Sequence, residues 1–419
     1  MDTSKSLGYQ VIISFSQDDL FYQHLLKQID FEWAVKLNRF SLKLIGLWPK
    51  TEHSIQEKLM YNLRPPIVAL TLTIGILIPS IHSLIRIRSN IMLLMDNLQF
   101  TLPAITCTLR IVIFWWKKKA VIWVLNMVAK DWLKLKSAQD RSAMIRRAQT
   151  ARIIITCAYG AMTIAFVFVA VLPICGISMR YLTNITDPGR VLPLQTYYFY
   201  YDVTKRPQYE LTFIVQIICI FLAIFAYTGI DNFLGLLVFH ICGQLEILKN
   251  RITHLDKFIN FHDALKNSVI DHIRLFRAIA LVEDTFSIIL LVLFLYFGIL
   301  FACYGVLIIS LLERGNDMSI TRLICQISLI INTFGHMCVY CVVGEILVAQ
   351  CDQIQHAVYN YKWYSLEPKN ARNLIFLLGR SNKPTYLTAG KVFPITMATF
   401  SNLIKTSASY MSVLLTAKT

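Results

Sequence analysis

Seven stretches of the chain are predominantly apolar over about 20 residues and contain few charged side chains. A helix on the surface of a soluble protein carries a polar face, whereas a helix that is apolar on nearly all sides lies in a large core or in lipid. A length of about 20 residues is also what a helix needs to cross the hydrocarbon part of a bilayer. We therefore predict membrane-spanning helices over 67–85, 98–116, 153–173, 211–237, 287–312, 323–347 and 393–415.

The composition of the whole chain agrees with this prediction. Hydrophobic residues make up 56% of the 419 residues and charged residues only 16%, whereas roughly 25% of a soluble domain is charged. A mean hydropathy of +0.53 leaves more apolar surface than one soluble core hides, which excludes ordinary cytosolic, disordered and collagen-like proteins. The sequence therefore predicts an all-α membrane protein with seven transmembrane helices.

The fourth apolar stretch continues in a different pattern. After residue 237, apolar side chains recur at helical spacing at Leu245, Leu248, Ile252 and Leu255. A helix of about 40 residues is about 60 Å long, which is twice the hydrocarbon thickness of a bilayer. We expect this helix to project from the membrane into water.

The distribution of positive charge predicts the orientation of the chain. The connections 1–66, 117–152, 243–284 and 350–391 carry thirty Lys and Arg residues, and the alternate connections carry nine. Because Lys and Arg are enriched on the cytosolic side, we predict a cytosolic N-terminus and an extracellular C-terminus. The only N-x-[ST] sequon, at Asn184, then lies outside, where glycosylation takes place. This orientation is inverted relative to G-protein-coupled receptors.

The sequence shows no catalytic or metal-binding motif. Seven of the ten cysteines lie within the apolar stretches, and the CxxC pattern of Cys338 and Cys341 has no second pair to complete a metal site. The nine histidines form no HExxH motif, and Gly-rich phosphate loops and GxSxG patterns are absent. We therefore expect no enzyme activity, no metal, no cofactor and no nucleic-acid partner.

The last apolar stretch carries a line of polar side chains, here called the polar stripe. Its members recur every three or four residues, on one side of a helix: Asn402, Lys405 with Thr406, Ser409, Ser412 and Thr416. The stripe either lines a water-filled path or packs on a neighbouring helix through hydrogen bonds, and the spacing does not decide between these. If it lines water, four or five copies of the chain are needed, and Val413 supplies a hydrophobic constriction.

Two ionisable residues lie deep inside predicted membrane helices. Arg110 falls in the second helix and Asp231 in the fourth. Ionisable groups at such positions often take part in function, but no partner is evident in the sequence. For these two residues we favour buried structural pairing, or snorkelling of Arg110 to the interface, over a functional relay.

Several motifs along the chain resemble those of insect odorant receptors. The most specific is the C-terminal run 390–396 (Gly-Lys-Val-Phe-Pro-Ile-Thr), followed by Phe400, 403–407 (Leu-Ile-Lys-Thr-Ser) and 409–410 (Ser-Tyr). The sequence 45–49 (Ile-Gly-Leu-Trp-Pro) is similar to a motif of hymenopteran members. The stretches 240–245, 357–359 and 363–364 match the inner end of the fourth helix and the region after the sixth.

The resemblance implies a function that the residue patterns alone do not. Insect odorant receptors form tetrameric, odorant-gated, non-selective cation channels in which a tuning subunit assembles with a shared co-receptor. Their last helices line one pore, which favours the pore interpretation of the polar stripe and places Val413 at the gate. The cytosolic connection 243–284 lacks the long insertion of the co-receptor. This implies a tuning subunit in the plasma membrane of an olfactory neuron dendrite.

With this resemblance the chain divides into four parts. Residues 1–66 form a helical cytosolic region, and 67–347 form six transmembrane helices with the odorant-binding bundle. Residues 348–392 form a cytosolic anchor region, and 393–419 form the pore-lining seventh helix with a short extracellular tail.

The resemblance also implies where ligands and subunits bind. The family holds odorants between the second, third, fourth and sixth helices, where this sequence offers apolar and hydroxyl side chains suited to a small volatile molecule: Phe100, Thr101, Thr163, Phe166, Phe213, Ile217, Ile327 and Phe334. The tyrosine-rich cluster 197–201 forms either an aromatic belt at the membrane interface or part of a lid. In the cytosolic region, Trp363 and Tyr364 are expected to hold subunits together.

Other functional classes remain as alternatives. A gustatory receptor has the same architecture, although the 46–49 motif and the 405–407 core of the last helix favour an odorant receptor. A G-protein-coupled receptor requires the opposite orientation. A transporter usually shows an internal repeat, which this sequence lacks.

Overall fold

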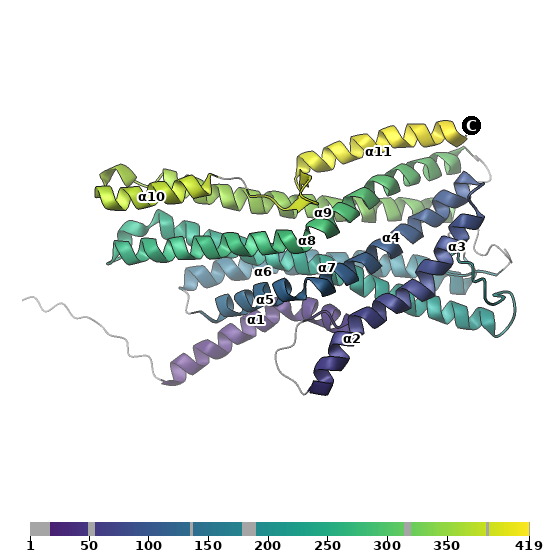
Figure 1. The fold of residues 1–419 in the computed structure, drawn as a ribbon, viewed down its shortest axis with the longest axis horizontal. Coiled ribbons are helices and arrows are strands. Elements are labelled where there is room, and N and C mark those ends of the chain that lie inside the picture. The colour runs from purple at the N-terminus through teal and green to yellow at the C-terminus, as the bar shows by residue number, and fades with distance from the viewer. Residues whose placement is uncertain are drawn as a thin grey trace, which may run out of the picture.

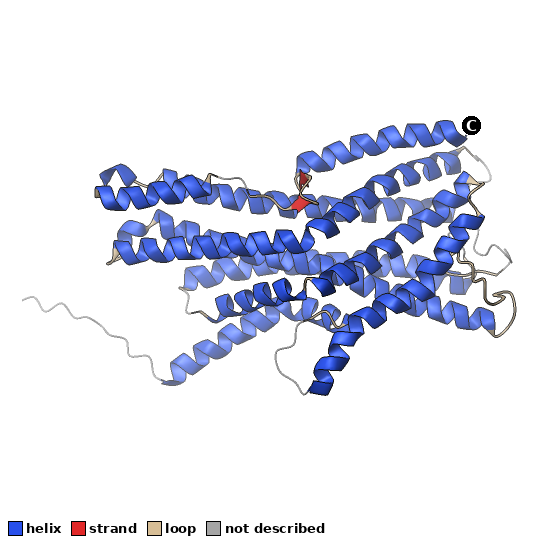
Figure 2. Ribbon diagram, in the orientation of Figure 1, coloured by secondary structure: helices blue, strands red, loops and turns tan. Residues whose placement is uncertain are grey.

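The computed structural model describes residues 17–48, 55–134, 137–177, 190–313, 320–382 and 385–418. These residues are mostly helical, with one two-stranded antiparallel sheet (Figure 1, Figure 2). The elements in chain order are α1 (Gln17–Ile45), α2 (Ile55–Leu72), η1 (Thr73–Leu77), α3 (Ile78–Arg86), α4 (Ile91–Trp116), α5 (Lys118–Leu133), α6 (Ala138–Phe166), η2 (Val167–Val171), η3 (Leu172–Cys175), α7 (Gln208–Thr253), η4 (Leu255–Lys257), α8 (Phe261–Leu312), α9 (Ile320–Tyr359), η6 (Trp363–Ser365), α10 (Pro368–Ser381), β1 (Thr388–Ala389), β2 (Phe393–Pro394) and α11 (Met397–Lys418).

Six helical segments of the described chain are long and apolar enough to cross a membrane: Tyr61–Arg86, Ile91–Trp116, Ala138–Cys175, Gln208–Thr253, Phe261–Leu311 and Arg322–Ser365. They coincide with the first six predicted segments, which are therefore confirmed. The seventh predicted segment is α11, whose polar positions leave it outside this set. It is nevertheless a continuous helix of 22 residues.

The seventh helix begins at Met397 rather than at the predicted Phe393, because Phe393 belongs to strand β2. The turn between β1 and β2 contains Gly390, which adopts a φ of +60° and donates its N–H to the carbonyl of Ser287 on α8 at 2.8 Å. A Cβ atom at this glycine would lie 2.5 Å from the side chain of Leu291. The hairpin therefore attaches the start of α11 closely to α8.

Three helices extend far beyond the length of a membrane crossing: α7 has 46 residues, α8 has 52 and α9 has 40. The predicted extension of the fourth spanning helix is confirmed, and the fifth and sixth extend in the same way, which the sequence analysis did not predict. Leu248, Leu275 and Ile354 belong to the main hydrophobic core, so the extensions are packed together. We call this end of the molecule, where α10 lies, the extension end (Figure 1).

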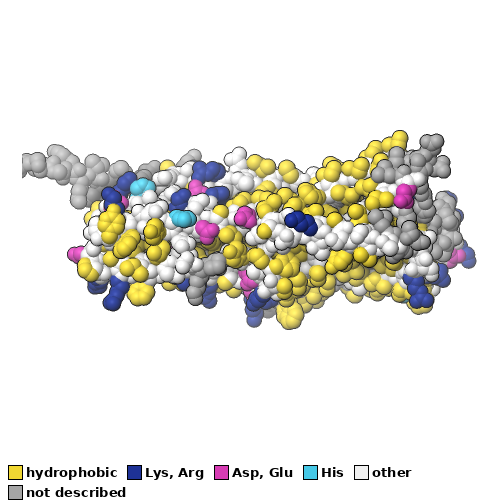
Figure 3. All heavy atoms as spheres, turned by 90° about the horizontal axis from the view of Figure 1, so that it is seen from above, with side chains coloured by type: hydrophobic (Ala, Val, Ile, Leu, Met, Phe, Trp, Pro, Cys, Tyr) yellow, Lys and Arg dark blue, Asp and Glu magenta, His cyan; other side chains and the backbone are white. Residues whose placement is uncertain are grey.

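The opposite end of the bundle, here called the loop end, carries residues 190–207. Figure 3 shows Lys, Arg, Asp and Glu side chains gathered over the extension end, and mostly hydrophobic side chains over the part of the surface between it and the loop end. This is the surface of a protein whose middle zone lies in lipid.

Helix α7 lies at the centre of the bundle, because α1, α4, α6, α8 and α9 all pack against it. Phe233 of α7 is fully buried. Trp48, which follows α1, meets the ring of Phe233 edge to face with centroids 6.2 Å apart, and Phe114 of α4 does the same at 5.7 Å. The tryptophan of the 45–49 motif is thus a core residue that anchors the end of α1.

The glycine of the same motif has a backbone conformation that other residues adopt only with strain. Gly46 follows the last residue of α1 with a φ of +82°, and a Cβ atom there would lie 2.5 Å from the Cβ of Arg64. We expect Gly46→Ala to destabilise the protein by about 1–2 kcal/mol, because L residues are strained in this conformation. The measurement is the melting temperature of the purified protein. Gly160→Ala, in α6 with nothing within 4 Å of its added Cβ, is the control, and equal melting temperatures for both variants would contradict the argument.

Candidate functional site

Helices α4, α6, α7, α8 and α9 line a cavity of about 170 Å³ in the loop-end half of the apolar zone. Its walls are largely apolar and aromatic, and include Phe100, Tyr227, Tyr296, Phe297 and Tyr304. We call it the aromatic cavity. Its size and lining suit a small, mostly apolar molecule that is oriented by few polar contacts.

A few polar side chains face the aromatic cavity, and most of them are held by neighbours. Gln99 donates from Nε2 to Asp96 Oδ1 at 3.0 Å, and its Oε1 accepts from Gln326 Nε2 at 3.2 Å. Thr333 Oγ1 lies 3.4 Å from the hydroxyl oxygen of Tyr304. These bonds fix the polar groups, so the cavity has a defined polar lining before any ligand enters.

A buried ionic network lies between the aromatic cavity and the extension end. Arg110 Nη1 donates to both carboxylate oxygens of Asp231, at 2.8 and 2.9 Å, and His336 Nε2 lies 3.0 Å from Asp231 Oδ2. The side chains of Arg110 and Asp231 are 1% and 7% exposed. The guanidinium also lies 4.0 Å from the ring centroid of Tyr227. Of the two interpretations drawn from the sequence, buried pairing or snorkelling of Arg110, the structure shows buried pairing, and the network ties α4, α7 and α9 together.

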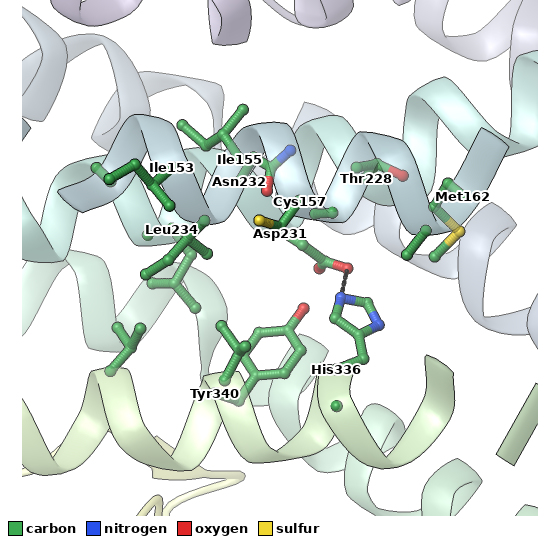
Figure 4. Close-up of a pocket in the computed structure, with 18 of the residues that line it drawn as sticks. Ile153, Ile155, Cys157, Met162, Thr228, Asp231, Asn232, Leu234, His336 and Tyr340 are labelled. Atoms are coloured by element: carbon green, nitrogen blue, oxygen red, sulfur yellow. Dashed lines mark ion pairs between the residues drawn. The ribbon is translucent and has the colours of Figure 1, made fainter. Parts of the chain in front are cut away.

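A second cavity, of about 350 Å³, lies between α6, α7 and α9 beside the network, with Asp231 and His336 among its lining residues (Figure 4). We call it the α6–α9 groove. Gly235 and Gly335 line it, and no atom of the described residues lies within 4 Å of a Cβ added to either. Met162, Asn332 and His336 line both the groove and the aromatic cavity. The two spaces are therefore neighbours that share part of their walls.

The residues predicted to bind the ligand are spread over several places. Phe100 and Phe166 line the aromatic cavity from α4 and α6. Thr101 is buried, with its hydroxyl bonded to the backbone of α4, and Phe213 packs on a small core at the loop end. The other four are partly or largely exposed and do not line the cavity: Thr163, Ile217, Ile327 and Phe334. The structure therefore brings together two of the eight, and a ligand role for all eight stays a prediction.

The sequence analysis missed the contribution of α8 to the aromatic cavity. Tyr296, Phe297 and Tyr304 all line it. Phe297 and Tyr304 are seven residues apart and so lie on one face of the helix. This spacing is readable in the sequence. The direction of that face is not, because α8 is apolar on nearly all sides here.

Residues 190–207 cover the loop end of the bundle. Leu194 lines the aromatic cavity, and its N–H donates to Gln216 Oε1 at 2.9 Å. In the tyrosine-rich cluster, Tyr198 is buried and donates to a backbone carbonyl of η1 at 2.9 Å. Phe199 and Tyr200 are exposed. Tyr198 thus anchors residues 190–207 to the bundle, whereas Phe199 and Tyr200 face outwards.

Helix α11 lies at the edge of the bundle and packs one face on α8 and α9 (Figure 1). Ser407 is buried on that face. The polar stripe is on the exposed face, with Val413 65% exposed beside it; the exposed stripe residues are Asn402, Lys405, Thr406, Ser409, Ser412 and Thr416. The polar stripe is thus exposed in the single chain, and Asn402, Thr406 and Val413 line a pocket of about 730 Å³ between α11 and α8.

A series of ring contacts connects the aromatic cavity with α11. Phe297 of the cavity wall stacks on Phe301 with centroids 6.3 Å apart. Phe301 meets Phe334 of α9 at 6.4 Å, and Phe334 meets Phe400 of α11 at 5.0 Å. The predicted residue Phe334 therefore lies on this path rather than in the cavity.

The two residues predicted to hold subunits together lie away from the apolar zone. Trp363 and Tyr364 form part of η6 at the extension end, where they are 37% and 74% exposed. Asn184 lies outside the described residues. In the described part of the chain, no group of three or more His, Cys, Asp or Glu side chains is arranged to hold a metal ion.

Residues 90–408 match the protein family described as 7tm Odorant receptor. The chain belongs to this family. It is 24% identical to Odorant receptor Or2 of Anopheles gambiae over 54% of this chain and 61% of that one. It is 23% identical to Odorant receptor 13a of Drosophila melanogaster over 94% of this chain and 97% of the fly protein.

The fold agrees with the family. The insect olfactory receptor OR5 of Machilis hrabei, solved with eugenol, superposes with a TM-score of 0.78 at 15% identity, covering 94% of this chain and 100% of that one. The resemblance drawn from the sequence motifs and the predicted all-α membrane fold are confirmed. Because the relatives are odorant receptors rather than enzymes, the prediction that this chain is not an enzyme is confirmed as well.

The ionic network of this odorant receptor allows the effect of one substitution on the stability of the fold to be predicted. Arg110→Met leaves Asp231 buried without its guanidinium partner, and losing one member of a buried pair costs about 3–5 kcal/mol. We expect a large loss of surface expression and of melting temperature. Lys117→Met, which removes an exposed pair with Asp284, is the control and costs at most about 1 kcal/mol. A double variant Arg110→Met with Asp231→Leu should recover much of the loss, and no recovery would contradict the pairing argument.

Proposed function

We propose that this odorant receptor is the ligand-binding subunit of an odorant-gated cation channel. The observation that carries the proposal is the aromatic cavity, which is lined by five membrane helices. Small volatile molecules are mostly apolar, so burying them among aromatic rings provides affinity and a few fixed polar groups orient them. The structure of OR5 in complex with eugenol supports the same class of ligand for this chain.

The conducting part of the proposed channel is α11. A line of exposed polar side chains on a helix in the membrane requires water or another subunit beside it. One chain supplies one such helix, so several subunits must place their α11 helices around a common axis. Val413, exposed next to the polar stripe, then supplies the hydrophobic constriction that closes the pore by dewetting.

Ligand and pore are linked through side chains of the same subunit. The ring contacts from Phe297 through Phe301 and Phe334 to Phe400 run from the cavity wall to the packed face of α11. A ligand that shifts the cavity wall would displace this series of rings. The proposal is that this displacement moves α11 and opens the pore.

The proposed partner is an odorant co-receptor, with which this chain forms a heterotetramer. Support comes from the family, and from Trp363 and Tyr364, two aromatic side chains that are exposed at the extension end of the single chain. Large aromatic groups are enriched where protein surfaces meet. The charge distribution supports a cytosolic extension end, an extracellular C-terminus and, with the family, a place in the plasma membrane of olfactory dendrites.

The experiment that tests this function is patch-clamp recording in cells that express the chain with and without an insect co-receptor. A panel of volatiles is applied in the presence and absence of a G-protein blocker. Cation current that needs the co-receptor and ignores the blocker is the expected result. Current that the blocker abolishes would instead support a metabotropic receptor and reverse the proposed orientation.

A substitution in α11 tests the gate separately. We expect Val413→Ala to raise the leak current without ligand severalfold, because a smaller apolar side chain widens the constriction and lets water enter. Val112→Ala, which shortens an exposed valine on α4, is the matched control and should leave the leak unchanged. Leak currents that are the same in both variants and in the unmodified protein would remove Val413 as the gate.

A further inference from the structure

His336 lies at the junction of the aromatic cavity and the α6–α9 groove and lines both. Its side chain is 15% exposed. The rings of Tyr227 and Tyr340 lie 5.2 Å from the imidazole, centroid to centroid, and that of Phe297 lies 6.2 Å away. The imidazole is therefore packed firmly between aromatic groups at the edge of the space proposed for the ligand.

The ionic network determines which nitrogen of His336 carries a proton. Nε2 lies 3.0 Å from a carboxylate oxygen of Asp231, and a carboxylate only accepts hydrogen bonds. Nε2 must therefore carry the hydrogen. The charge of Asp231 is balanced by Arg110. A neutral imidazole with its hydrogen on Nε2 has a hydrogen-bond acceptor at its other nitrogen, Nδ1.

This acceptor is available to a ligand. Nδ1 forms no hydrogen bond with the described residues, whereas Gln99 is bonded to two neighbouring side chains. In Figure 4 the second ring nitrogen of His336 is directed away from Asp231. Met162 lines the groove together with His336. Met162 also lines the aromatic cavity. The structure thus presents a fixed acceptor where the two spaces meet.

We propose that His336 determines the specificity of the aromatic cavity, and that the receptor prefers ligands with a hydroxyl group, namely alcohols and phenols, which donate a hydrogen bond to Nδ1. The inference rests on the proposed function, since it takes the aromatic cavity as the ligand site. A ligand that offers only acceptors, such as an ether or a ketone, leaves Nδ1 unpaired. The buried acceptor then loses its hydrogen bond to water without gaining one to the ligand.

The test uses pairs of ligands that differ only in the donor. Eugenol is compared with its O-methyl ether, and a linear alcohol with its methyl ether, in cells that also express a co-receptor. We expect the hydroxyl member of each pair to activate at a roughly three- to tenfold lower concentration, as one net hydrogen bond provides. In His336→Phe the ratio should fall to about one, because the ring remains and the acceptor is lost.

Two further variants separate specificity from folding. His336→Gln restores an acceptor through its amide oxygen, and should recover part of the preference for the hydroxyl member. Tyr340→Phe changes a neighbour of the network that lines the groove but not the aromatic cavity, so it should leave the ratio unchanged. A merely structural role of His336 would weaken the responses to both members of a pair equally and would leave the ratio unchanged in His336→Phe.

The outcomes distinguish this inference from the proposed function. Equal responses to the hydroxyl and ether members in the unmodified receptor would overturn the inference and leave the channel proposal standing. If no volatile evokes a current, the channel proposal fails, and the same ligand pairs are compared by the rise in melting temperature of the purified protein. A larger rise with the hydroxyl member, lost in His336→Phe, would still support the inference, and equal rises would overturn it.

Discussion

The structure depends on one constraint, which is that the charges of Arg110 and Asp231 must be neutralised in a zone surrounded by lipid. Each charge alone is costly there, so the two side chains meet and hold α4 and α7 together at one depth. His336 joins α9 to the same point. The aromatic cavity and the α6–α9 groove meet at this convergence of three helices, where His336 lines both.

The two ends of the bundle, on either side of this ionic network, differ in structure. At the loop end, residues 190–207 cover the helices, and Leu194 reaches the aromatic cavity. At the extension end, α7, α8 and α9 continue as packed helices, and the β1–β2 hairpin attaches α11 to α8. The central position of α7 connects both ends, because it runs from the cover to the end of the extensions. The aromatic cavity and the proposed pore helix are thus parts of one continuous packing arrangement.

Structural features that follow from the order of apolar and polar residues along the chain could be predicted from the sequence. Six apolar stretches became helices long enough to cross a membrane, and the continued apolar spacing at Leu245 and Leu248 marked the extension of α7. Contacts between distant segments were not predictable in the same way. The start of α11 was misplaced because the pairing of Phe393 with a strand depends on a hairpin that packs on α8. Local apolar character does not distinguish a strand residue from a helix residue over so short a stretch.

The sequence by itself determined that this is an all-α membrane protein with seven transmembrane helices, and its motifs identified the family. Only the tertiary structure decided that Arg110 pairs with Asp231, that α8 contributes Tyr296, Phe297 and Tyr304 to the cavity, and that His336 stands at its edge. The physical reason lies in the helices themselves. A helix in lipid is apolar on all sides. Its composition therefore indicates an apolar environment, but not the direction in which each side chain points. That direction is set by packing between helices that are far apart in the chain.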